Sequence, residues 1–371
     1  MQIGVPKEIK NHEYRVGLTP AAVKELVRNG HDVLVERHAG AAIGFADQHY
    51  IAAGARIADD PADIFASAEM IVKVKEPQPE ECDRLRDGQI LFTYLHLAPN
   101  ADLTKRLVDS GCVAIAYETV TDSRGGLPLL APMSEVAGRM AIQAGARCLE
   151  LSQGGEGILL SGVPGVMPAR VLILGGGVVG VNAARMASGL GARVTLLDVS
   201  VARLRELDQH FSSKFATRYA TQEAIEDELV RADLVIGAVL IPGSAAPKLV
   251  TRQMLKLMKP GAVLVDVAID QGGCFESSHP TTHQDPTFVV DGVVHYCVAN
   301  MPGAVARTAT QALSHATLPF VQTLAAKGWK EAMRADLNLQ AGLNVCHGKV
   351  AYPAVAMAHG YPCETVKSCL A

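Results

Sequence analysis

The chain has 371 residues, 49% of them hydrophobic and 19% charged, with a formal net charge of −4 at pH 7 and a pI of about 6.3. A single hydrophobic core stops growing at roughly 250–300 residues, so this length predicts two domains. The weakly acidic balance excludes the basic surface that nucleic acid needs. Because no uncharged apolar run reaches the ~18 residues of a membrane-spanning helix, we expect no membrane partner either.

The eight cysteines form neither a Cys-x-x-Cys pair nor a compact framework, a pattern typical of a reducing compartment. Met1 leads directly into a strand-like run at residues 2–5, so no signal peptide is expected. These features predict a soluble cytoplasmic protein.

Short apolar runs alternate with amphipathic ones in the first third of the chain. The expected strands lie at residues 2–5, 32–36, 70–75, 89–95 and 113–118. Helices are predicted between them, one of them opened by Thr19 as N-cap and Pro20 in its first turn. Strands that alternate with helices favour a parallel, doubly wound α/β sheet. Because this part contains no Gly-x-Gly-x-x-Gly motif, we assign it to the substrate rather than to a nucleotide.

The most informative stretch is residues 171–198, where an apolar run, a glycine cluster, a helix and a second β-branched run follow one another. Gly175, Gly177 and Gly180 form a Gly-x-Gly-x-x-Gly motif at the strand-to-helix turn. Such glycines allow a tight turn, backbone approach to a pyrophosphate, and close packing of the helix on the strand. Asp198 ends the second strand, where a carboxylate can accept hydrogen bonds from ribose hydroxyls and repel a 2′-phosphate. The stretch therefore predicts a site for NAD rather than NADP.

The same alternation continues around this motif. One long helix is predicted before it, at residues 133–151. Later strands are expected before Tyr219 and at residues 233–240, 262–269 and 293–300, with helices at 201–211, 221–232 and 251–258. Together with the first two strands, these complete the six strands of a dinucleotide-binding fold.

After Met301 the pattern is helical, at residues 306–329 and 330–343 and in a shorter piece near 352–359, and no strand is expected. We expect these helices to pack on the first domain. The fold class predicted is therefore α/β, with two doubly wound Rossmann-like domains separated by a cleft and the second inserted into the first. The expected boundaries are residues 1–128 plus 307–371 for the substrate domain and 129–306 for the NAD-binding domain.

Ligands of open α/β sheets bind beyond the carboxyl ends of the strands. This rule selects Lys75 and His96 in the first domain and, in the second, Asp270 and Asn300, which face the same expected cleft. Arg15, in the loop after the first strand, and Lys75 suit the carboxylate of a small 2-oxo or 2-amino acid, Arg by a bidentate fork and Lys as a point charge. His96 can exchange a proton near neutral pH, and Asp270 can orient water or ammonia and stabilise an iminium charge.

Each of these residues also has a purely structural interpretation. Lys75 can be a solvated charge, His96 a packed loop residue, and Asp270 the start of a turn. Their convergence on strand ends around one expected cleft favours the functional interpretation.

Cys274, His279 and His283 superficially resemble metal ligands. Pro280 opposes a helix that would place the two histidines on one face, and the segment has the composition of a loop. We therefore expect no metal site.

At the candidate site residues Arg15, Lys75, His96 and Asp270, the chain resembles the alanine dehydrogenase and pyridine nucleotide transhydrogenase family, and within it the NAD-dependent alanine dehydrogenases. The resemblance covers nearly the whole length and rests on long segments, notably VPKEIKNHEYRVGLTP, LPLLAPMSEVAGRMA, VDVAIDQGGCFE and HYCVANMPGAV. It implies NAD as the cofactor and a reversible oxidative deamination of L-alanine to pyruvate and ammonia. It also implies a homo-oligomer, specifically a hexamer.

Residue by residue, the resemblance implies that Arg15 and Lys75 bind the substrate carboxylate, with Asn300 also beside the substrate. His96 and Asp270 match the catalytic pair. The cofactor contacts that it implies are Ser134, Gly175, Gly177, Val178, Val179, Gly180, Asp198, Arg203, Val239, Leu240, Val267, Ala268, Ile269, Asp270, Val298, Ala299, Asn300 and Met301.

One position departs from the family pattern. Ala220 stands where members usually have a serine that contributes to the adenosine side of the cofactor site. Thr221, the next residue, is the alternative source of that hydroxyl.

Two alternative functions remain open, a transhydrogenase subunit and a non-catalytic NAD-binding protein. Neither needs the combination of Lys75, His96 and Asp270, and the first works with a membrane proton channel. An assay for NADH production from alanine separates both from a dehydrogenase.

Overall fold

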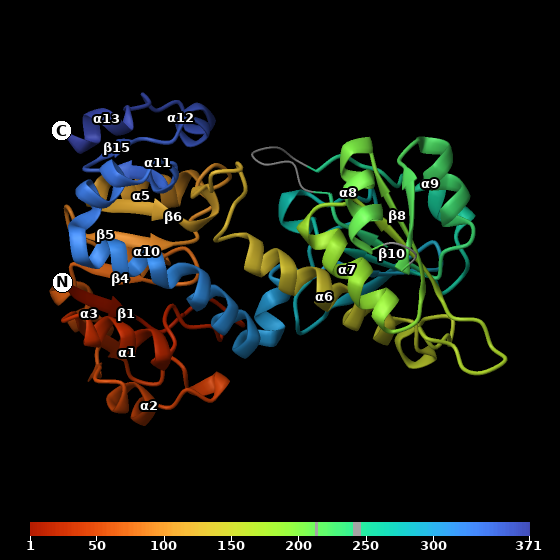
Figure 1. The fold of residues 1–371 in the computed structure, drawn as a ribbon, viewed down its shortest axis with the longest axis horizontal. Helices are drawn as coiled ribbons and strands as arrows, with labels where there is room; N and C mark the ends of the chain where they lie inside the picture. The colour runs from red at the N-terminus through yellow and green to blue at the C-terminus, as the bar shows by residue number, and fades with distance from the viewer. Residues whose placement is uncertain (212–213, 240–245) are drawn as a thin grey trace. The chain divides into compact units, whose positions relative to one another are not determined.

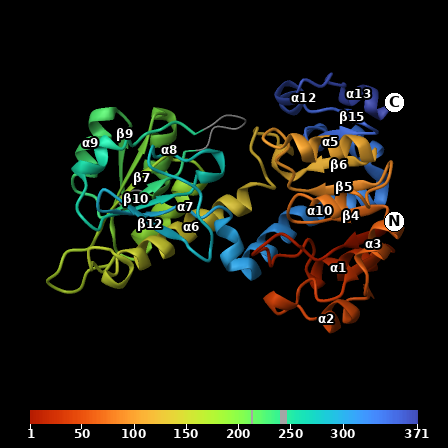
Figure 2. The same ribbon diagram turned by 180° about the vertical axis from the view of Figure 1, so that it is seen from behind.

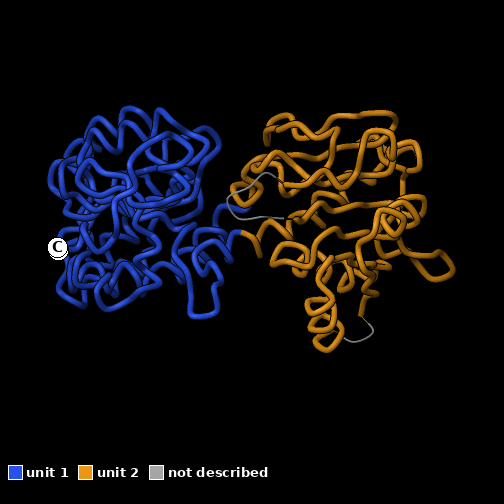
Figure 3. The backbone as a smooth tube through the Cα atoms, turned by 90° about the horizontal axis from the view of Figure 1, so that it is seen from above, with its two compact units in different colours: residues 1–133, 305–371 blue, residues 134–304 orange. Residues whose placement is uncertain are grey.

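The computed structural model describes residues 1–211, 214–239 and 246–371. The chain divides into two compact units, shown in Figure 3: unit 1 contains residues 1–133 and 305–371, and unit 2 contains residues 134–304. Unit 2 is therefore inserted in the sequence of unit 1, which holds both chain termini (Figure 1). No described helix has the length and apolarity needed to span a lipid bilayer.

Unit 1 is built on one large sheet. Its strands, all within the described residues, are β1 (Gln2–Val5), β2 (Asp32–Glu36), β3 (Arg56–Ala58), β4 (Met70–Val72), β5 (Ile90–Thr93), β6 (Val113–Ala116), β14 (Leu343–Cys346) and β15 (Lys349–Val350). They lie in the order β15-β14-β6-β5-β4-β1-β2-β3. Strands β1 to β6 are parallel, and the winding reverses between β1 and β4, as in a doubly wound sheet.

Helices cover both faces of this sheet (Figures 1 and 2). They are α1 (Pro20–Arg28), α2 (Asp47–Ala52), α3 (Pro61–Ser67), α4 (Pro79–Cys82), α5 (Ala101–Ser110), α10 (Ala306–Ala335), α11 (Leu337–Gln340), α12 (Pro353–His359) and α13 (Val366–Leu370). Alternate residues of each strand enter different cores, as the two-residue period of a strand requires. On β1 and β4, Ile3 and Met70 pack with α1 and α10, whereas Ile71 packs with α3 and α5 on the other face.

The C-terminal segment was expected to be entirely helical, and this prediction was wrong. β14 and β15 extend the sheet, with β14 antiparallel to β6 and β15 antiparallel to β14. The strands are too short, four and two residues, to show a period of their own. Long-range pairing with β6 determines their conformation. The helix α10 is long but is interrupted at Gly328, whose φ of 73° is not helical.

Unit 2 contains the second sheet. Its strands within the described residues are β7 (Arg170–Leu174), β8 (Arg193–Asp198), β9 (Ala216–Tyr219), β10 (Leu234–Gly237), β11 (Val263–Asp266), β12 (Thr287–Val290) and β13 (Val293–Tyr296). They lie in the order β12-β13-β11-β10-β7-β8-β9. All are parallel except β12, an antiparallel edge strand that the sequence did not indicate. The expected six-stranded dinucleotide-binding arrangement is present, with β12 added beside it.

The helices of unit 2 are α6 (Ala131–Cys148), which begins at the end of unit 1, α7 (Val178–Gly189), α8 (Val201–Phe211) and α9 (Gln222–Leu229). The segment at residues 251–258, expected as an α-helix, contains the short 3₁₀ helix η5 (Gln253–Leu257). It joins α9 in covering one face of the sheet. Helices α6 and α7 lie on the opposite face, where Leu234 approaches Gly145 of α6 and Ile173 approaches Gly180 of α7. The two doubly wound domains predicted from the sequence, one inserted in the other, are confirmed.

Several strands end earlier than the sequence predicted. β4 ends at Val72 rather than Lys75, β5 at Thr93, β11 at Asp266 and β13 at Tyr296. The candidate residues Lys75, His96, Asp270 and Asn300 therefore lie in the loops after these strands. In three of the four cases an acidic side chain binds backbone N–H groups just past the strand end, as described below.

Candidate active site

The glycine loop of unit 2 joins β7 to α7, at the carboxyl edge of the sheet where the strand order reverses. Gly175 has a φ of 105°, a conformation that residues with a side chain rarely adopt. At Gly180, a Cβ atom would lie only 1.8 Å from the Gly175 carbonyl oxygen, so only glycine lets the helix approach the loop. At Gly177, by contrast, a Cβ atom would meet no atom within 4 Å. The glycine there is not required by protein packing, which leaves room for the close approach of a ligand to the backbone.

Asp198, at the end of β8, is tied to the glycine loop. Its carboxylate accepts hydrogen bonds from the backbone N–H groups of Gly176 (2.7 Å) and Ser200 (2.8 Å). Arg203 donates from Nε to the Gly176 carbonyl (2.7 Å) and pairs with Glu206 (2.8 Å). The carboxylate expected to bind ribose is thus held at a fixed distance from the loop expected to bind pyrophosphate.

The other expected cofactor residues lie on the same edge of unit 2. Val178 and Val179 open α7, Ser134 lies in the first turns of α6, and Val239 follows β10. Residues 267–270 follow β11, and residues 298–301 follow β13. Leu240 lies outside the described residues. The candidate set therefore surrounds the carboxyl ends of β7, β8, β10, β11 and β13.

In unit 1, Lys75 lies three residues beyond β4, in a loop held by Glu8. One oxygen of the buried Glu8 carboxylate accepts from the backbone N–H of Val74 (2.7 Å) and of Lys75 (3.2 Å). These amides bond to a side chain instead of a neighbouring strand, which is why the strand ends early. Thr93 donates its hydroxyl to the Lys75 carbonyl (2.9 Å), so the backbone is held on both sides of Lys75.

Arg15 is almost fully buried, with 2% of its side chain exposed, and binds Glu13. Its Nε and Nη2 donate to the two Glu13 oxygens at 2.7 and 2.6 Å, and its Nη1 lies 3.1 Å from the Met133 sulfur. Burial lowers the pKa of Arg15, but the bond to Glu13 outweighs it and the net effect is a rise. Glu13 thus binds one edge of the guanidinium that was predicted to bind a substrate carboxylate.

His96 follows β5 in a left-handed conformation, with a φ of 50°. Glu118, just past β6, accepts its backbone N–H at 2.6 Å and that of Leu95 at 3.2 Å. The imidazole Nδ1 lies 3.9 Å from the same carboxylate, and the ring stacks on Tyr94 with centroids 5.9 Å apart. Half of the His96 side chain remains exposed, so a held imidazole with an accessible surface is available for proton transfer.

Asp270 and Asn300 lie on the carboxyl edge of unit 2. Asp270 is exposed in the 3₁₀ helix η6 (Ile269–Gln271), and Asn300 has a left-handed φ of 67°. Asp266, fully buried at the end of β11, organises the loop that carries Asp270. It accepts backbone N–H bonds from Ala268 (3.2 Å) and Cys274 (2.9 Å) and the Ser278 hydroxyl (2.6 Å). Burial raises the pKa of Asp266, and these hydrogen bonds oppose the rise.

Four acidic residues that support the site were not predicted from the sequence: Glu8, Glu13, Glu118 and Asp266. Each is buried or nearly so, and each lies beside a candidate residue or its loop. Asp266 carried one signal, a carboxylate within an otherwise apolar strand. Buried carboxylates need partners, so such a position points to a hydrogen-bonding role.

The residues that resembled metal ligands have other contacts. His279 stacks on Phe288 with ring centroids 3.7 Å apart, and His283 hydrogen-bonds to the Asn300 carbonyl (3.0 Å). Across residues 1–211, 214–239 and 246–371, no group of three His, Cys, Asp or Glu side chains could hold a metal ion.

Two family models together match most of the chain: the N-terminal domain of Alanine dehydrogenase/PNT over residues 4–137, and its C-terminal domain over residues 141–353. The alanine dehydrogenase of Halomonas elongata is 65% identical over 360 residues, 97% of each chain. The chain belongs to the alanine dehydrogenase/PNT family. A solved structure of an L-alanine dehydrogenase superposes with a TM-score of 0.93 at 53% identity, covering all of both chains.

A more distant structural relative has a different name. The transhydrogenase of Sinorhizobium meliloti superposes with a TM-score of 0.83 at 26% identity, covering 94% of this chain and all of that one. The two-unit fold therefore serves more than one activity, and the activity of this chain depends on its site residues.

The structure groups the candidate residues into two sets. Arg15, Lys75 and His96 follow β1, β4 and β5, which are neighbours in the order β5-β4-β1 of unit 1. Asp270 and Asn300 lie in unit 2. Each set lies at the carboxyl edge of its own sheet, where ligands of doubly wound folds bind.

Proposed function

We propose that the chain catalyses the reversible, NAD-dependent oxidative deamination of L-alanine to pyruvate and ammonia. One observation supports the cofactor assignment: at Gly177, at the N-terminus of α7, a Cβ atom would meet no protein atom within 4 Å, which leaves space for a ligand. The full-length relatives of the chain are alanine dehydrogenases.

The residues of the glycine loop fit a dinucleotide. Helix N-terminal amides carry unpaired donors and a partial positive charge, so the start of α7 suits the pyrophosphate. Asp198 presents a carboxylate to the ribose and disfavours a 2′-phosphate. When bound, NAD supplies the acceptor for the hydride that leaves the α-carbon of alanine.

Unit 1 supplies the substrate contacts. Lys75 provides a point charge for the alanine carboxylate, and Arg15, which also pairs with Glu13, provides a second cation. His96 takes up the proton released as water attacks the iminium carbon, donates it to the nitrogen that leaves as ammonia, and accepts the hydroxyl proton as the pyruvate carbonyl forms; the reverse direction uses the same transfers in the opposite order. Asp270 orients the water or ammonia and stabilises the positive charge of the iminium.

We infer that the protein works in the cytoplasm as a homohexamer. Large apolar side chains are exposed in unit 2, including Leu151 (77%), Leu159 (61%) and Met167 (59%), as expected where another copy packs. Sedimentation equilibrium tests the assembly: a hexamer has six times the 39.2 kDa mass of one chain.

The activity is tested with purified protein, NAD or NADP, and each common amino acid in turn, following NADH absorbance. Alanine with NAD should give the highest kcat/KM, and pyruvate with ammonia should drive the reverse reaction. Absence of both reactions under conditions where NADH binds would contradict the proposal and favour a non-catalytic NAD-binding protein.

A further inference from the structure

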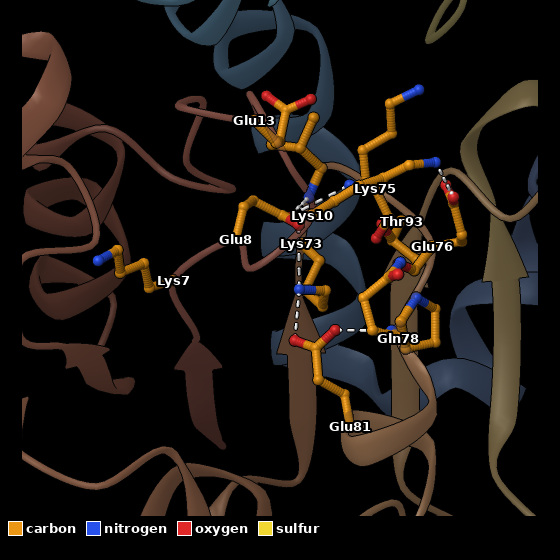
Figure 4. A network of polar contacts seen from close by, with 12 residues as sticks. Lys7, Glu8, Lys10, Glu13, Lys73, Lys75, Glu76, Gln78, Glu81 and Thr93 are labelled. Carbon is orange, nitrogen blue, oxygen red and sulfur yellow. Dashed lines mark hydrogen bonds and ion pairs between the residues drawn. The ribbon is translucent and has the colours of Figure 1, made fainter.

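Three charged side chains are buried together beneath the loop that carries Lys75. Glu8, Lys73 and Glu81 have side chains that are 2%, 0% and 4% exposed. Lys73 donates to Glu8 at 3.1 Å and to Glu81 at 2.6 Å. Figure 4 shows this group, which we call the Glu8–Lys73–Glu81 cluster.

Stability alone does not account for such a cluster. Moving an ion out of water costs several kcal/mol, and apolar side chains of similar volume often serve stability as well or better. The pKa of Lys73 is nonetheless raised to about 12, since the two carboxylates outweigh the effect of burial, which lowers it. Burial raises the pKa of Glu8, but its partners are two backbone N–H groups and an ammonium, all donors, so the ionised form fits the site.

The cluster fixes the backbone from which Lys75 extends. Glu8 binds the amides of Val74 and Lys75, and the second oxygen of Glu81 accepts the N–H of Gln78 (2.8 Å). Together with the Thr93 bond to the Lys75 carbonyl, both peptide groups flanking Lys75 are held (Figure 4). The backbone on both sides of Lys75 is therefore fixed.

Glu8 also connects the two cationic candidates. It lies in the loop between β1 and α1, which carries Arg15, yet it binds the backbone of Lys75 some 67 residues later in the chain. A substrate carboxylate held by two cations requires both to keep their spacing, because misplacement of binding groups by about 1 Å can cost around 100-fold in rate.

We propose that Glu8, held in turn by Lys73 and Glu81, is a positioning residue that sets the place of Lys75 for the substrate carboxylate. This inference rests on the proposed function, in which Lys75 binds that carboxylate. In this role Glu8 acts through the backbone of Lys75, which it binds.

The test is a double-mutant cycle between Glu8→Ala and Lys75→Met, with kcat/KM for alanine and the NADH dissociation constant measured for each variant. Glu8→Ala leaves Lys73 and Glu81 as a neutral pair. In the wild-type background it should raise KM for alanine and for pyruvate at least tenfold, with NADH affinity within twofold. In the Lys75→Met background it should change kcat/KM by less than twofold, because the residue through which it acts is gone.

Lys10→Gln is the matched control. Lys10 lies on the same loop as Glu8 and pairs with Glu76 beside Lys75, but it is 42% exposed. Its replacement should leave KM within twofold of wild type, since exposed pairs contribute little.

The outcomes are distinct. If Glu8→Ala reduces kcat/KM by the same factor in both backgrounds, or lowers kcat with KM unchanged, its role is general stability and the inference is overturned. If Lys75→Met itself leaves KM for alanine unchanged, the proposed function of Lys75 fails instead. Should Glu8→Ala not fold, Glu8→Gln replaces it, because Gln keeps an acceptor for the amides and loses the charge facing Lys73. Its KM should rise at least threefold, again only when Lys75 is present, and an equal effect without Lys75 overturns the inference.

Discussion

Alanine substitutions at two glycines of the same motif should change different properties. Gly177→Ala should weaken NADH binding, and Gly180→Ala should destabilise the fold. At Gly177 the added methyl group meets no atom of the protein within 4 Å, and φ is −71°, which alanine adopts readily. Alanine is a poorer N-cap than glycine but restricts the unfolded chain, and each effect is about 0.5–1 kcal/mol with opposite sign. We expect the free energy of unfolding of Gly177→Ala to stay within about 1 kcal/mol of wild type.

The cost of Gly177→Ala should appear in cofactor binding. A methyl group there occupies the space through which a pyrophosphate would approach the backbone. Loss of one hydrogen bond to a charged phosphate is worth about 1.5–3 kcal/mol, or roughly ten- to a hundredfold in the NADH dissociation constant. NADH fluorescence titration measures it directly.

Gly180→Ala should instead destabilise the fold. Its Cβ would lie 1.8 Å from a backbone oxygen of Gly175, whereas non-bonded atoms pack at about 3.5–4.0 Å. Because that oxygen cannot rotate away, the loop and α7 must separate, and we expect a loss of at least about 3 kcal/mol in urea unfolding, the upper end of overpacking costs.

Gly189→Ala, at the other end of α7, is the control, since its Cβ also meets nothing within 4 Å. It should leave NADH binding unchanged. Normal NADH affinity in Gly177→Ala, or normal stability in Gly180→Ala, would refute the assignment of these two roles.

Four further predictions concern the cofactor, the proton and the thiols. Asp198→Ala should narrow the NAD/NADP ratio of kcat/KM by about tenfold or more, equivalent to roughly 1.4 kcal/mol. The loop bonds that Asp198 also makes affect both cofactors equally, so an unchanged ratio removes it from cofactor selection. Ala220→Ser should lower KM for NAD about two- to tenfold at constant kcat, the value of one neutral hydrogen bond. The Thr221 hydroxyl accepts from Ala224 as the N-cap of α9. If Ala220→Ser leaves KM for NAD unchanged and Thr221→Val raises it, the role belongs to Thr221. His96→Ala should reduce kcat by roughly 10²–10⁴-fold with NADH affinity intact, and a loss below tenfold would exclude it as the acid/base. Thiol titration at pH 8 should detect Cys363 rapidly and the six buried cysteines only after unfolding, since burial raises the pKa of thiols such as Cys274 to about 12. These thiols stay protonated in the folded state while unfolded ones ionise from about pH 8.5–9, so the free energy of unfolding should fall as pH rises above that value. Rapid reaction of all eight in the folded protein would contradict the burial.

The sequence was sufficient for the parts of the fold that depend on local pattern. Alternating strands and helices predicted both doubly wound sheets, and the glycine motif predicted the turn from β7 to α7. The choice of Lys75, His96 and Asp270 as strand-end residues followed from one topological rule. Their catalytic roles stay predictions.

The parts that failed depend on contacts between distant residues. The end of β4 is set by Glu8, which lies 66 residues before Val74, and no local pattern carries that information. In the same way, β14 is a strand only because β6 is available to pair with it. The pairing of Arg15 with Glu13 was also missed, because both residues lie in a loop, where no helical or strand period indicates which side chains meet.

The insertion of unit 2 has a consequence for synthesis on the ribosome. Once residue 304 has emerged, every strand and helix of unit 2 is available to fold. Unit 1 is then still missing β14, β15 and α10, although its first 133 residues were made earlier. Until α10 arrives, the face of its sheet that buries Leu313, Val321 and Leu324 is covered only in part, by α1. The half of the protein that is translated first is thus the last to be completed, and its partly open apolar face is where a nascent chain would need a chaperone.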